Sequence, residues 1–477
     1  MVWISNAVGV VNDILWTYVL ITLLIAAGLW FSWRTGFVQI RMLPEMVAIL
    51  TDGVGSRTRE GHISPFQAFC ISTASRVGVG NIAGIAIAVV LGGPGAVFWM
   101  WTIALIGAAS GFVESTLAQI YKIPLETGGF RGGPAYYIKN VLKAPRIAAF
   151  FAVLISVTYG LIFNSVQANT IALSLQTAFG WNPLYVGGVV TVFAVLLISG
   201  GLTKIARVME WMVPLMAGIY ILTALSIMMI HITELPGIIA LIFMDAWDFQ
   251  SLAGGGFGAT IMAGIKRGLF SNEAGMGAVP NAAATADASH PVKQGLIQAF
   301  GVFVDTILVC SASAFIVLCS GDYQAIGLTG IALIQYDLSL FLGEWAAGAL
   351  ALFIILFAFS SIVGNYYYSE INIGFIHGGK FAIRSFRMAV GVMIMVGTLA
   401  QLELVWNLAD FFMALMAITN IIAILLLFRP VQQALADYRQ QRRNGVKKPV
   451  FSAEILSDRT GVVCWQGGDL YELQQRG

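Results

Sequence analysis

Three basic residues fall inside long apolar stretches of the sequence, where a charged side chain is costly. Arg76 lies in the stretch 66–91, and Lys266 and Arg267 lie in the stretch 256–285. At the centre of a membrane helix each such charge costs roughly 2.5–3.5 kcal/mol. Arginine cannot escape this cost by losing its proton, so Arg76 requires a carboxylate nearby.

Four acidic residues also lie inside apolar stretches: Glu114, Glu273, Asp305 and Asp410. We expect Glu114 or Glu273 to pair with Arg76, and such a pair would brace a helix. Direct contact between Arg76 and a substrate is the alternative. Lys266 and Arg267 are expected near the membrane edge, without a mechanistic role.

Glycine interrupts two of the apolar stretches. The interruptions read Val77-Gly-Val-Gly-Asn-Ile-Ala-Gly84 and Leu269-Phe-Ser-Asn-Glu-Ala-Gly-Met-Gly277. Glycine weakens a helix, although in a membrane it also serves close helix packing alone. An unwound helix exposes N–H groups that attract a carboxylate and C=O groups that attract a cation. Two such breaks predict a site for an amino acid zwitterion together with Na⁺.

Polar side chains close to the breaks, or in other apolar stretches, are candidates to complete this site. The hydroxyl and amide oxygens that suit Na⁺ or an α-amino group belong to Asn81, Ser271, Asn272, Ser360, Ser361 and Asn365. Gln167 interrupts the apolar stretch 147–178. It either contacts the substrate or bonds a neighbouring helix.

No enzyme signature competes with this interpretation. The sequence contains no GxSxG, HExxH or P-loop pattern, so we predict neither an enzyme nor an organic cofactor. The four cysteines lack metal-ligand spacing and are predicted to be free thiols: Cys70, Cys310, Cys319 and Cys464. The basic residues are spread over many loops, which argues against a nucleic acid partner.

The composition is that of a membrane protein. Hydrophobic residues make up 58% and charged residues only 10% of the chain, too little charge to cover a water-soluble surface. Apolar runs of about 20 residues recur, the length that crosses a hydrocarbon core. Eleven spans are predicted among membrane lipids: 14–33, 66–91, 95–120, 147–178, 184–200, 208–231, 256–285, 294–319, 344–368, 384–399 and 403–428. The oligomeric state stays open.

Lysine and arginine are distributed unevenly among the loops. The segment before the first span and the loops after the even-numbered spans contain none, whereas the loops after the odd-numbered spans hold nearly all 26. Positive residues stay on the cytoplasmic side of a membrane. We therefore expect a multi-pass protein of the bacterial inner (plasma) membrane, with the N-terminus outside and the C-terminus in the cytoplasm.

The two interrupted spans are five apart in order, so two successive five-span units would have opposite orientations. This predicts an inverted repeat formed by 66–231 and 256–428, with 14–33 as an extra helix. Residues 1–428 would form the transporter domain. Residues 429–477 would form a cytoplasmic tail that faces solvent or lipid headgroups.

The sequence resembles the alanine or glycine:cation symporters, which are the sodium:alanine symporter family of the amino acid–polyamine–organocation superfamily. Besides the two breaks, the matching stretches are Ser64-Pro-Phe-Gln-Ala-Phe69, Gly92-Gly-Pro-Gly-Ala-Val-Phe-Trp-Met-Trp101, Phe130-Arg-Gly-Gly-Pro-Ala-Tyr-Tyr137 and Phe357-Ala-Phe-Ser-Ser361. The resemblance implies an all-α, leucine-transporter-like fold. It also implies symport of a small amino acid, such as alanine or glycine, with Na⁺ into the cell by alternating access.

The same resemblance implies the residues of the site. The substrate would lie against Gly78, Val79, Gly80, Asn81, Gln167, Ser271, Asn272, Gly275, Met276 and Gly277, with Arg76 and Asn365 as further candidates. Na⁺ would bind the carbonyls of Ala74 and Val77 and the hydroxyls of Ser360 and Ser361. Arg76 and Val79 replace two threonines of the family pattern, so the amino acid stays open. An H⁺-coupled symporter, or a uniporter or channel for another amino acid, is the alternative.

Overall fold

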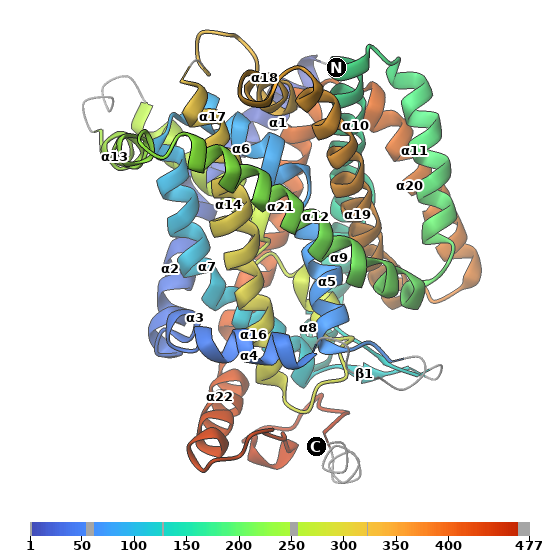
Figure 1. Ribbon diagram of the computed structural model, residues 1–477. Coiled ribbons are helices and arrows are strands. Elements are labelled where there is room, and N and C mark those ends of the chain that lie inside the picture. Colours follow the sequence, from blue (N-terminus) through green and yellow to red (C-terminus); the bar gives the residue numbers. More distant parts are fainter. Residues whose placement is uncertain (1, 54–61, 126–127, 249–255, 322, 466–477) are drawn as a thin grey trace.

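The computed structural model describes residues 2–53, 62–125, 128–248, 256–321 and 323–465. In this part of the chain the fold is a bundle of helices with one short antiparallel sheet, in which β1 (Ile123–Pro124) pairs with β2 (Phe130–Arg131). The predicted all-α architecture is therefore confirmed. Figure 1 shows long helices running between two ends of the bundle.

The helices of the first half of the chain are α1 (Val2–Ile14), α2 (Ile21–Arg34), α3 (Val38–Arg41), α4 (Leu43–Gly53), α5 (Pro65–Arg76), α6 (Val79–Gly92), α7 (Gly95–Ile120), α8 (Pro134–Asn140), α9 (Pro145–Val157), α10 (Asn164–Phe179), α11 (Pro183–Ile198) and α12 (Leu202–Ile230). Those of the second half are α13 (Leu235–Ala246), α14 (Gly256–Asn272), α15 (Val279–Ala283), α16 (Pro291–Val302), α17 (Ser311–Ser320), α18 (Gly330–Leu342), α19 (Trp345–Ile376), α20 (Lys380–Leu399), α21 (Leu402–Leu426) and α22 (Phe428–Arg443). The short 3₁₀ turn η5 (Ala453–Ile455) follows in the tail.

Nine helices in the described residues are long and apolar enough to cross a membrane. Three of them contain a π-helical segment: η1 (Leu15–Leu20) joins α1 to α2, η2 (Thr158–Phe163) joins α9 to α10, and η4 (Phe303–Cys310) joins α16 to α17. The predicted span 184–200 coincides with the shorter helix α11, and the predicted span 256–285 contains α14, the second break and α15. The count of eleven spans and the inverted repeat stay predictions.

Local sequence explains where α5 begins. The Ser64 hydroxyl accepts a hydrogen bond from the Gln67 N–H at 3.0 Å, and the Gln67 side chain accepts one from the Ser64 N–H at 3.0 Å. Pro65 follows as the first helical residue, where the missing N–H would have no partner in any case. This double cap fixes the start of the first broken helix.

Both predicted breaks are present. The first separates α5 from α6 at Val77 and Gly78. The second separates α14 from α15, and there the backbone at Glu273, Gly275 and Gly277 has φ values of 56°, 84° and 80°. Glycine adopts this left-handed conformation without a steric penalty, whereas Glu273 is an uncommon occupant.

The two broken helices lie beside each other in opposite directions. The first half α5 packs against the second half α15, and α6 packs against α14. Helix α19 contacts α5, and α7 contacts both α14 and α16. The two breaks therefore meet inside the bundle, surrounded by other helices.

The described part of the tail is not the solvated extension that we expected. Helix α22 packs against α7 and α16, at the end of the bundle opposite α13 and α18. Phe451 and Trp465 are buried, and the Trp465 indole donates to the Gln119 carbonyl at 2.9 Å. Burial of these aromatic surfaces holds the tail against the bundle. All four cysteines are free thiols, as predicted.

Candidate substrate and sodium site

The twelve residues predicted to contact substrate all lie in the buried interior, where the two breaks meet. They come from α5, α6, α10, α14, α19 and the two breaks that precede α6 and α15. The fold therefore brings together residues that are far apart in the sequence. The contacts that these residues make differ in several respects from the expectation.

At the first break, side-chain amides satisfy the exposed backbone N–H groups. The Gly78 N–H donates to Asn81 Oδ1 at 3.1 Å, and the Val79 N–H donates to Gln167 Oε1 at 3.2 Å. A side chain on Gly78 would overlap the Ser361 hydroxyl, so this close approach requires glycine. A carboxylate could replace the Gln167 oxygen, because both accept hydrogen bonds from N–H groups.

Asn81 also ties the first break to the neighbouring helices. Its Nδ2 donates to Ser271 Oγ at 2.7 Å and to the Asp305 carbonyl at 3.0 Å. Ser271 Oγ in turn lies 3.2 Å from Thr306 Oγ1 and 3.0 Å from Cys310 Sγ. This buried network joins α6, the end of α14 and η4.

At the second break, the protein supplies its own carboxylate. Glu114 Oε1 accepts from the Gly275 N–H at 3.1 Å, and Oε2 accepts from the Gly277 N–H at 3.0 Å and from Asn420 Nδ2 at 2.7 Å. The resemblance to the symporters implied that the substrate lies against Gly275 and Gly277, whereas their N–H groups bind Glu114 here. Glu114 occupies this place because the buried N–H groups need an acceptor, so it is not the partner of Arg76.

Arg76 pairs instead with Asp305, so the expected pairing with Glu114 or Glu273 was wrong. Arg76 Nε lies 3.2 Å from Asp305 Oδ2. Its Nη1 donates to the Gln298 carbonyl at 3.2 Å, and its Nη2 donates to Gln298 Oε1 at 3.3 Å. Asp305 faces α5 from the neighbouring π-helical segment and is closer to Arg76 than either glutamate. These contacts join the first half of the broken helix to α16 and η4.

Glu273 and Asn365 meet at a single hydroxyl group. Ser75 Oγ lies 2.8 Å from Glu273 Oε1 and 2.7 Å from Asn365 Oδ1. Asn365 Nδ2 donates to Asn164 Oδ1 at 3.0 Å. Asn365 therefore links α5 and α19 to the start of α10.

Asn272 and Met276 flank Glu273 in the second break, and both are buried. The Asn272 Oδ1 accepts from the Ala274 N–H at 3.0 Å. Among the described residues its buried Nδ2 has no hydrogen-bond partner. A buried donor without an acceptor is costly, so this amide is a candidate contact for a ligand.

The hydroxyl groups predicted to bind Na⁺ face different neighbours. Ser361 Oγ lies 2.9 Å from the Ala74 carbonyl oxygen and 3.1 Å from Phe357 O, and its single hydrogen can be donated to either. Ser360 Oγ donates to Phe357 O at 2.8 Å and lies 3.7 Å from Met216 Sδ. Ser361 is thus placed against the carbonyl end of α5, whereas Ser360 turns toward α12. Val77 is buried at the end of α5.

An ion pair lies on α14 about one turn before the second break. Arg267 Nη2 contacts both carboxylate oxygens of Asp410, at 2.5 and 2.6 Å, and is buried. Lys266 Nζ lies 3.8 Å from the same carboxylate. Asp410 on α21 therefore compensates the charge of Arg267 inside the protein, and the expected place of Arg267 near the membrane edge stays a prediction.

An aromatic stack extends from this ion pair to the first break. The Arg267 guanidinium lies 4.4 Å from the centroid of the Trp406 ring. Trp406 packs on Phe270 with ring centroids 4.8 Å apart, and Phe270 packs on Phe163 at 4.6 Å. A side chain on Gly80 would overlap the Phe270 ring. The stack therefore covers the start of α6.

The family model described as "Sodium:alanine symporter family" matches residues 1–453. The chain belongs to the sodium:alanine symporter family. The resemblance inferred from the motifs is confirmed. Members of this family are sodium-coupled amino acid symporters, so this symporter is a multi-pass membrane transporter.

Several relatives match the symporter over nearly its full length. The probable sodium/glutamine symporter GlnT of Bacillus subtilis is 52% identical over 466 residues, which cover 98% of this chain and 97% of that protein. The amino-acid carrier protein AlsT of the same organism is 47% identical and covers 97% and 98%. The sodium/alanine symporter AgcS of Methanococcus maripaludis is 36% identical and covers 93% and 99%.

A solved structure confirms the leucine-transporter-like fold of this symporter. The crystal structure of MhsT in complex with L-phenylalanine matches it with a TM-score of 0.55. The match covers 88% of this chain and 97% of that chain at 17% sequence identity. At this identity the likeness concerns the fold alone.

Two residues of the symporter's buried site were missed from the sequence. Gln298 holds Arg76, and Asn420 holds Glu114. Gln298 and Asn420 interrupt apolar stretches, as Gln167 does. That signal could have identified these residues as buried polar partners, although not their individual contacts.

Proposed function

We propose that this protein imports a small neutral amino acid, such as alanine or glycine, together with Na⁺. The observation that carries the proposal is the contact between the Ser361 hydroxyl and the Ala74 carbonyl, 2.9 Å apart. It places two hard oxygen ligands at the negative end of the half-helix α5, where a cation is favoured. The proposed location is the bacterial inner (plasma) membrane, with the N-terminus outside and the C-terminus in the cytoplasm.

The substrate carboxylate is proposed to bind at the start of α6. Glu114 already occupies the N–H groups of Gly275 and Gly277, which leaves the Gly78 and Val79 N–H groups of the first break. There the substrate would displace the Gln167 amide. Its α-amino group would lie toward the carbonyl end of α14, which carries a partial negative charge.

Close packing around Gly78 and Gly80 limits the size of a substrate that binds at the start of α6. A side chain on Gly78 would overlap Ser361, and one on Gly80 would overlap Phe270. Such tight surroundings favour a small side chain such as that of alanine or glycine. Phe163 and Phe270 would offer it an apolar contact.

Glutamine is a second candidate substrate, for two reasons. The relative GlnT, 52% identical to this chain, is named a probable sodium/glutamine symporter. The buried Nδ2 of Asn272, which has no partner among the described residues, would match the side-chain oxygen of glutamine. A larger substrate would require Phe270 to move.

Transport would follow an alternating-access cycle. All predicted substrate contacts are buried in this conformation, so the cycle must open a path to each side in turn. The Arg267–Asp410 ion pair and the stack of Trp406 on Phe270 cover the first break from the side of α14 and α21. We propose that separation of this pair opens the site toward the outside.

Uptake by proteoliposomes tests the proposal. Labelled alanine, glycine and glutamine are offered with Na⁺ or K⁺ outside, and counterflow identifies the substrate. Ser361→Ala should raise the Na⁺ concentration for half-maximal uptake severalfold, because the cation loses one oxygen ligand.

Ser226→Ala is the matched control for this variant. The Ser226 hydroxyl makes the same local bond, to a carbonyl one turn earlier at 2.9 Å, but on the exposed face of α12. An unchanged Na⁺ dependence in Ser361→Ala would remove Ser361 from the site. Wild-type uptake that does not depend on Na⁺ would favour the alternatives, which are an H⁺-coupled symporter, a uniporter or a channel.

A further inference from the structure

The hydroxyl of Ser75 lies between two oxygen atoms that both act as acceptors. Ser75 Oγ is 2.8 Å from Glu273 Oε1 and 2.7 Å from Asn365 Oδ1. A serine hydroxyl carries one hydrogen and can donate only one of these bonds. The other short contact therefore needs a hydrogen that belongs to the neighbouring group.

The backbone carbonyl of Gly160 fixes the direction of the whole chain of hydrogen bonds. A carbonyl only accepts, so Asn164 must direct its Nδ2 toward Gly160 O, 3.0 Å away. The Asn164 oxygen then faces Asn365, which must donate through its Nδ2 at 3.0 Å. Asn365 consequently presents its oxygen to Ser75. Reversing both amides would set the Asn164 oxygen against the Gly160 carbonyl, which is repulsive.

Because Ser75 must donate to Asn365, the hydrogen between Ser75 and Glu273 belongs to Glu273. We propose that Glu273 is a proton-binding site and that it carries a proton on Oε1 in this conformation. We further propose that this proton and Na⁺ bind in opposition. The second part rests on the proposed sodium site at Ala74 and Ser361.

Glu114 provides an internal comparison. It lies in the same buried region, but its neighbours donate hydrogen bonds to it. Each contact of Glu114 at the second break comes from a group that must donate, namely the Gly275 N–H, the Gly277 N–H and Asn420 Nδ2. Asn420 cannot be reversed, because its Nδ2 also donates to the Gly275 carbonyl at 2.9 Å. Glu114 therefore has the contacts of a carboxylate, whereas Glu273 has those of a carboxylic acid.

The charged and titratable groups around Glu273 do not compensate the negative charge that Glu273 would carry without a proton. Arg76 from α5 and Asp305 from η4 are its charged neighbours, and they already form an ion pair with each other. The titratable neighbours are Tyr159 from η2, which forms a hydrogen bond with Glu273, and Tyr368 from α19. Glu114 from α7 lies near these two tyrosines. Glu273 itself is 1% exposed, where an uncompensated carboxylate would be costly.

Protonation of Glu273 is connected to the proposed sodium site by position and by charge. Ser75 follows Ala74 on α5, and Asn365 lies one turn after Ser361 on α19. Loss of the proton would let the Ser75 hydroxyl donate to Glu273 instead of Asn365. The hydrogen bond between Ser75 and Asn365 would then be lost at the contact of α5 with α19, where Ala74 and Ser361 also lie. A negative Glu273 would favour a nearby cation, whereas the neutral acid would not. Lower pH should therefore weaken Na⁺ binding.

Na⁺-dependent uptake of the transported amino acid, measured with equal pH on both sides of the membrane, tests this proposal. In the wild type, the Na⁺ concentration for half-maximal uptake should rise as the pH falls, by up to about tenfold per pH unit for pure competition. Glu273→Gln should abolish this pH dependence, because its amide donates to Ser75 as the acid does but cannot titrate. The matched control is Glu344→Gln, an exposed glutamate at the start of α19, which should keep the wild-type profile.

A second set of measurements needs no transport. Addition of Na⁺ to the purified wild type in weak buffer should release up to about one proton per protein, and addition of K⁺ should not. In the infrared spectrum, Na⁺ should reduce the C=O band of a buried carboxylic acid, and this band should be missing in Glu273→Gln.

The outcomes separate this inference from the proposed function. Uptake that does not depend on Na⁺ at any pH would contradict the proposed function. Na⁺-dependent uptake that is invariant with pH, without proton release from the wild type, would overturn the proton site alone. A Glu273→Gln variant with the wild-type pH profile would also overturn it. If that variant fails to fold, proton release and the infrared band of the wild type decide.

Discussion

Arg76 fills the space that any side chain on Gly301 would need. A Cβ placed on Gly301 would overlap the Arg76 guanidinium. Gly301 lies one turn after Gln298, whose carbonyl and amide oxygen accept from Arg76, and one turn before Asp305, which pairs with it. These three residues share one face of the α16–η4 helix and form a socket for the arginine.

We expect Gly301→Ala to destabilise the protein as strongly as loss of the arginine itself. The displaced guanidinium would leave Asp305 buried without its partner, which costs on the order of 3–5 kcal/mol. Thermal unfolding in detergent measures the effect. Gly218→Ala on α12, where the new methyl group meets nothing within 4 Å, should be neutral.

Variants of the ion pair itself complement this test. Arg76→Ala should lower the unfolding temperature, and the double variant Arg76→Ala/Asp305→Ala should recover part of the loss. If Arg76→Ala instead unfolds at the same temperature as the wild type, and if different amino acids compete for uptake, Arg76 belongs to the substrate site.

Replacement of Glu114 by glutamine should disrupt the second break. The amide group would place an N–H opposite the N–H of Gly275 or Gly277, and each unsatisfied buried donor costs about 1–3 kcal/mol. We expect a lower unfolding temperature and little uptake from Glu114→Gln. Equal stability of Glu114→Gln and wild type would mean that the carboxylate charge is not needed at the break.

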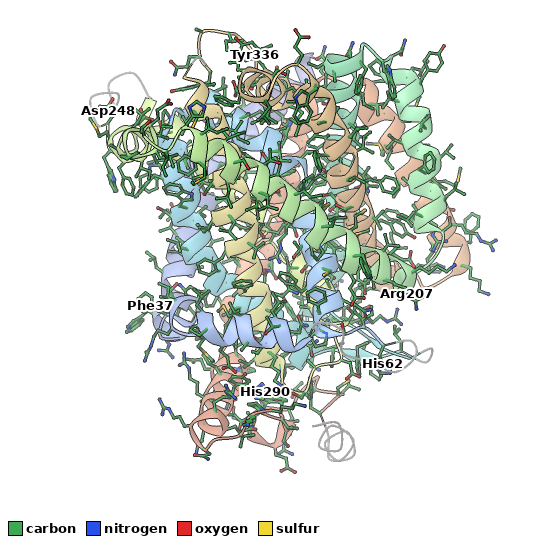
Figure 2. The ribbon with its side chains drawn as sticks, viewed as in Figure 1. Phe37, His62, Arg207, Asp248, His290 and Tyr336 are labelled. Atoms are coloured by element: carbon green, nitrogen blue, oxygen red, sulfur yellow. The ribbon has the colours of Figure 1, made fainter. Side chains whose placement is uncertain are left out.

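Cysteine labelling tests the orientation in the membrane. Cysteines at Asn182, Gln324 and Glu403, all exposed, should react with an impermeant thiol reagent on whole cells. Cysteines at the exposed positions Lys139 and Arg442 should react only after the membrane is opened. The background should be low because the four natural cysteines are buried. The reverse pattern would overturn the proposed topology, including a cytoplasmic place for the start of α12, where Figure 2 labels Arg207.

Docking of the tail should depend on pH through His290, which lies at the tail end of the bundle in Figure 2. His290 Nδ1 accepts from the Val292 N–H at 3.2 Å, and Nε2 lies 3.2 Å from Asp437 Oδ2 on α22. Burial lowers the pKa of His290 to about 4. The neutral ring therefore stabilises the docked tail above about pH 6.5. This stabilisation is lost as the pH falls toward 4.

The buried thiol of Cys464 reports on this docking. Its labelling in the wild type should accelerate below pH 6 relative to His290→Asn, measured at the same pH so that the reactivity of the reagent cancels. Asparagine keeps the cap at the start of α16 but does not titrate. Equal labelling rates of the two proteins at every pH would exclude His290 as the cause.

The helices and both breaks could be predicted because they depend on local properties of the sequence. A membrane span needs an uninterrupted apolar run of a certain length, and this condition can be read without knowing any neighbour. Glycines such as Gly78 and Gly277 weaken a helix wherever they occur. The motif Val77-Gly-Val-Gly-Asn81 therefore identified a break, and its polar residues identified the region of the site.

The partner of each polar side chain was decided only by the tertiary structure. Arg76 had several carboxylates within the same membrane, and it pairs with Asp305, more than 200 residues away in the sequence. Glu114 binds the N–H groups of Gly275 and Gly277, two residues against which the family resemblance placed the substrate. Successive residues of a helix point about 100° apart, so a small rotation of one helix against another exchanges one partner for the next. That rotation is fixed by the packing of all the helices together, and no local pattern in the sequence contains it.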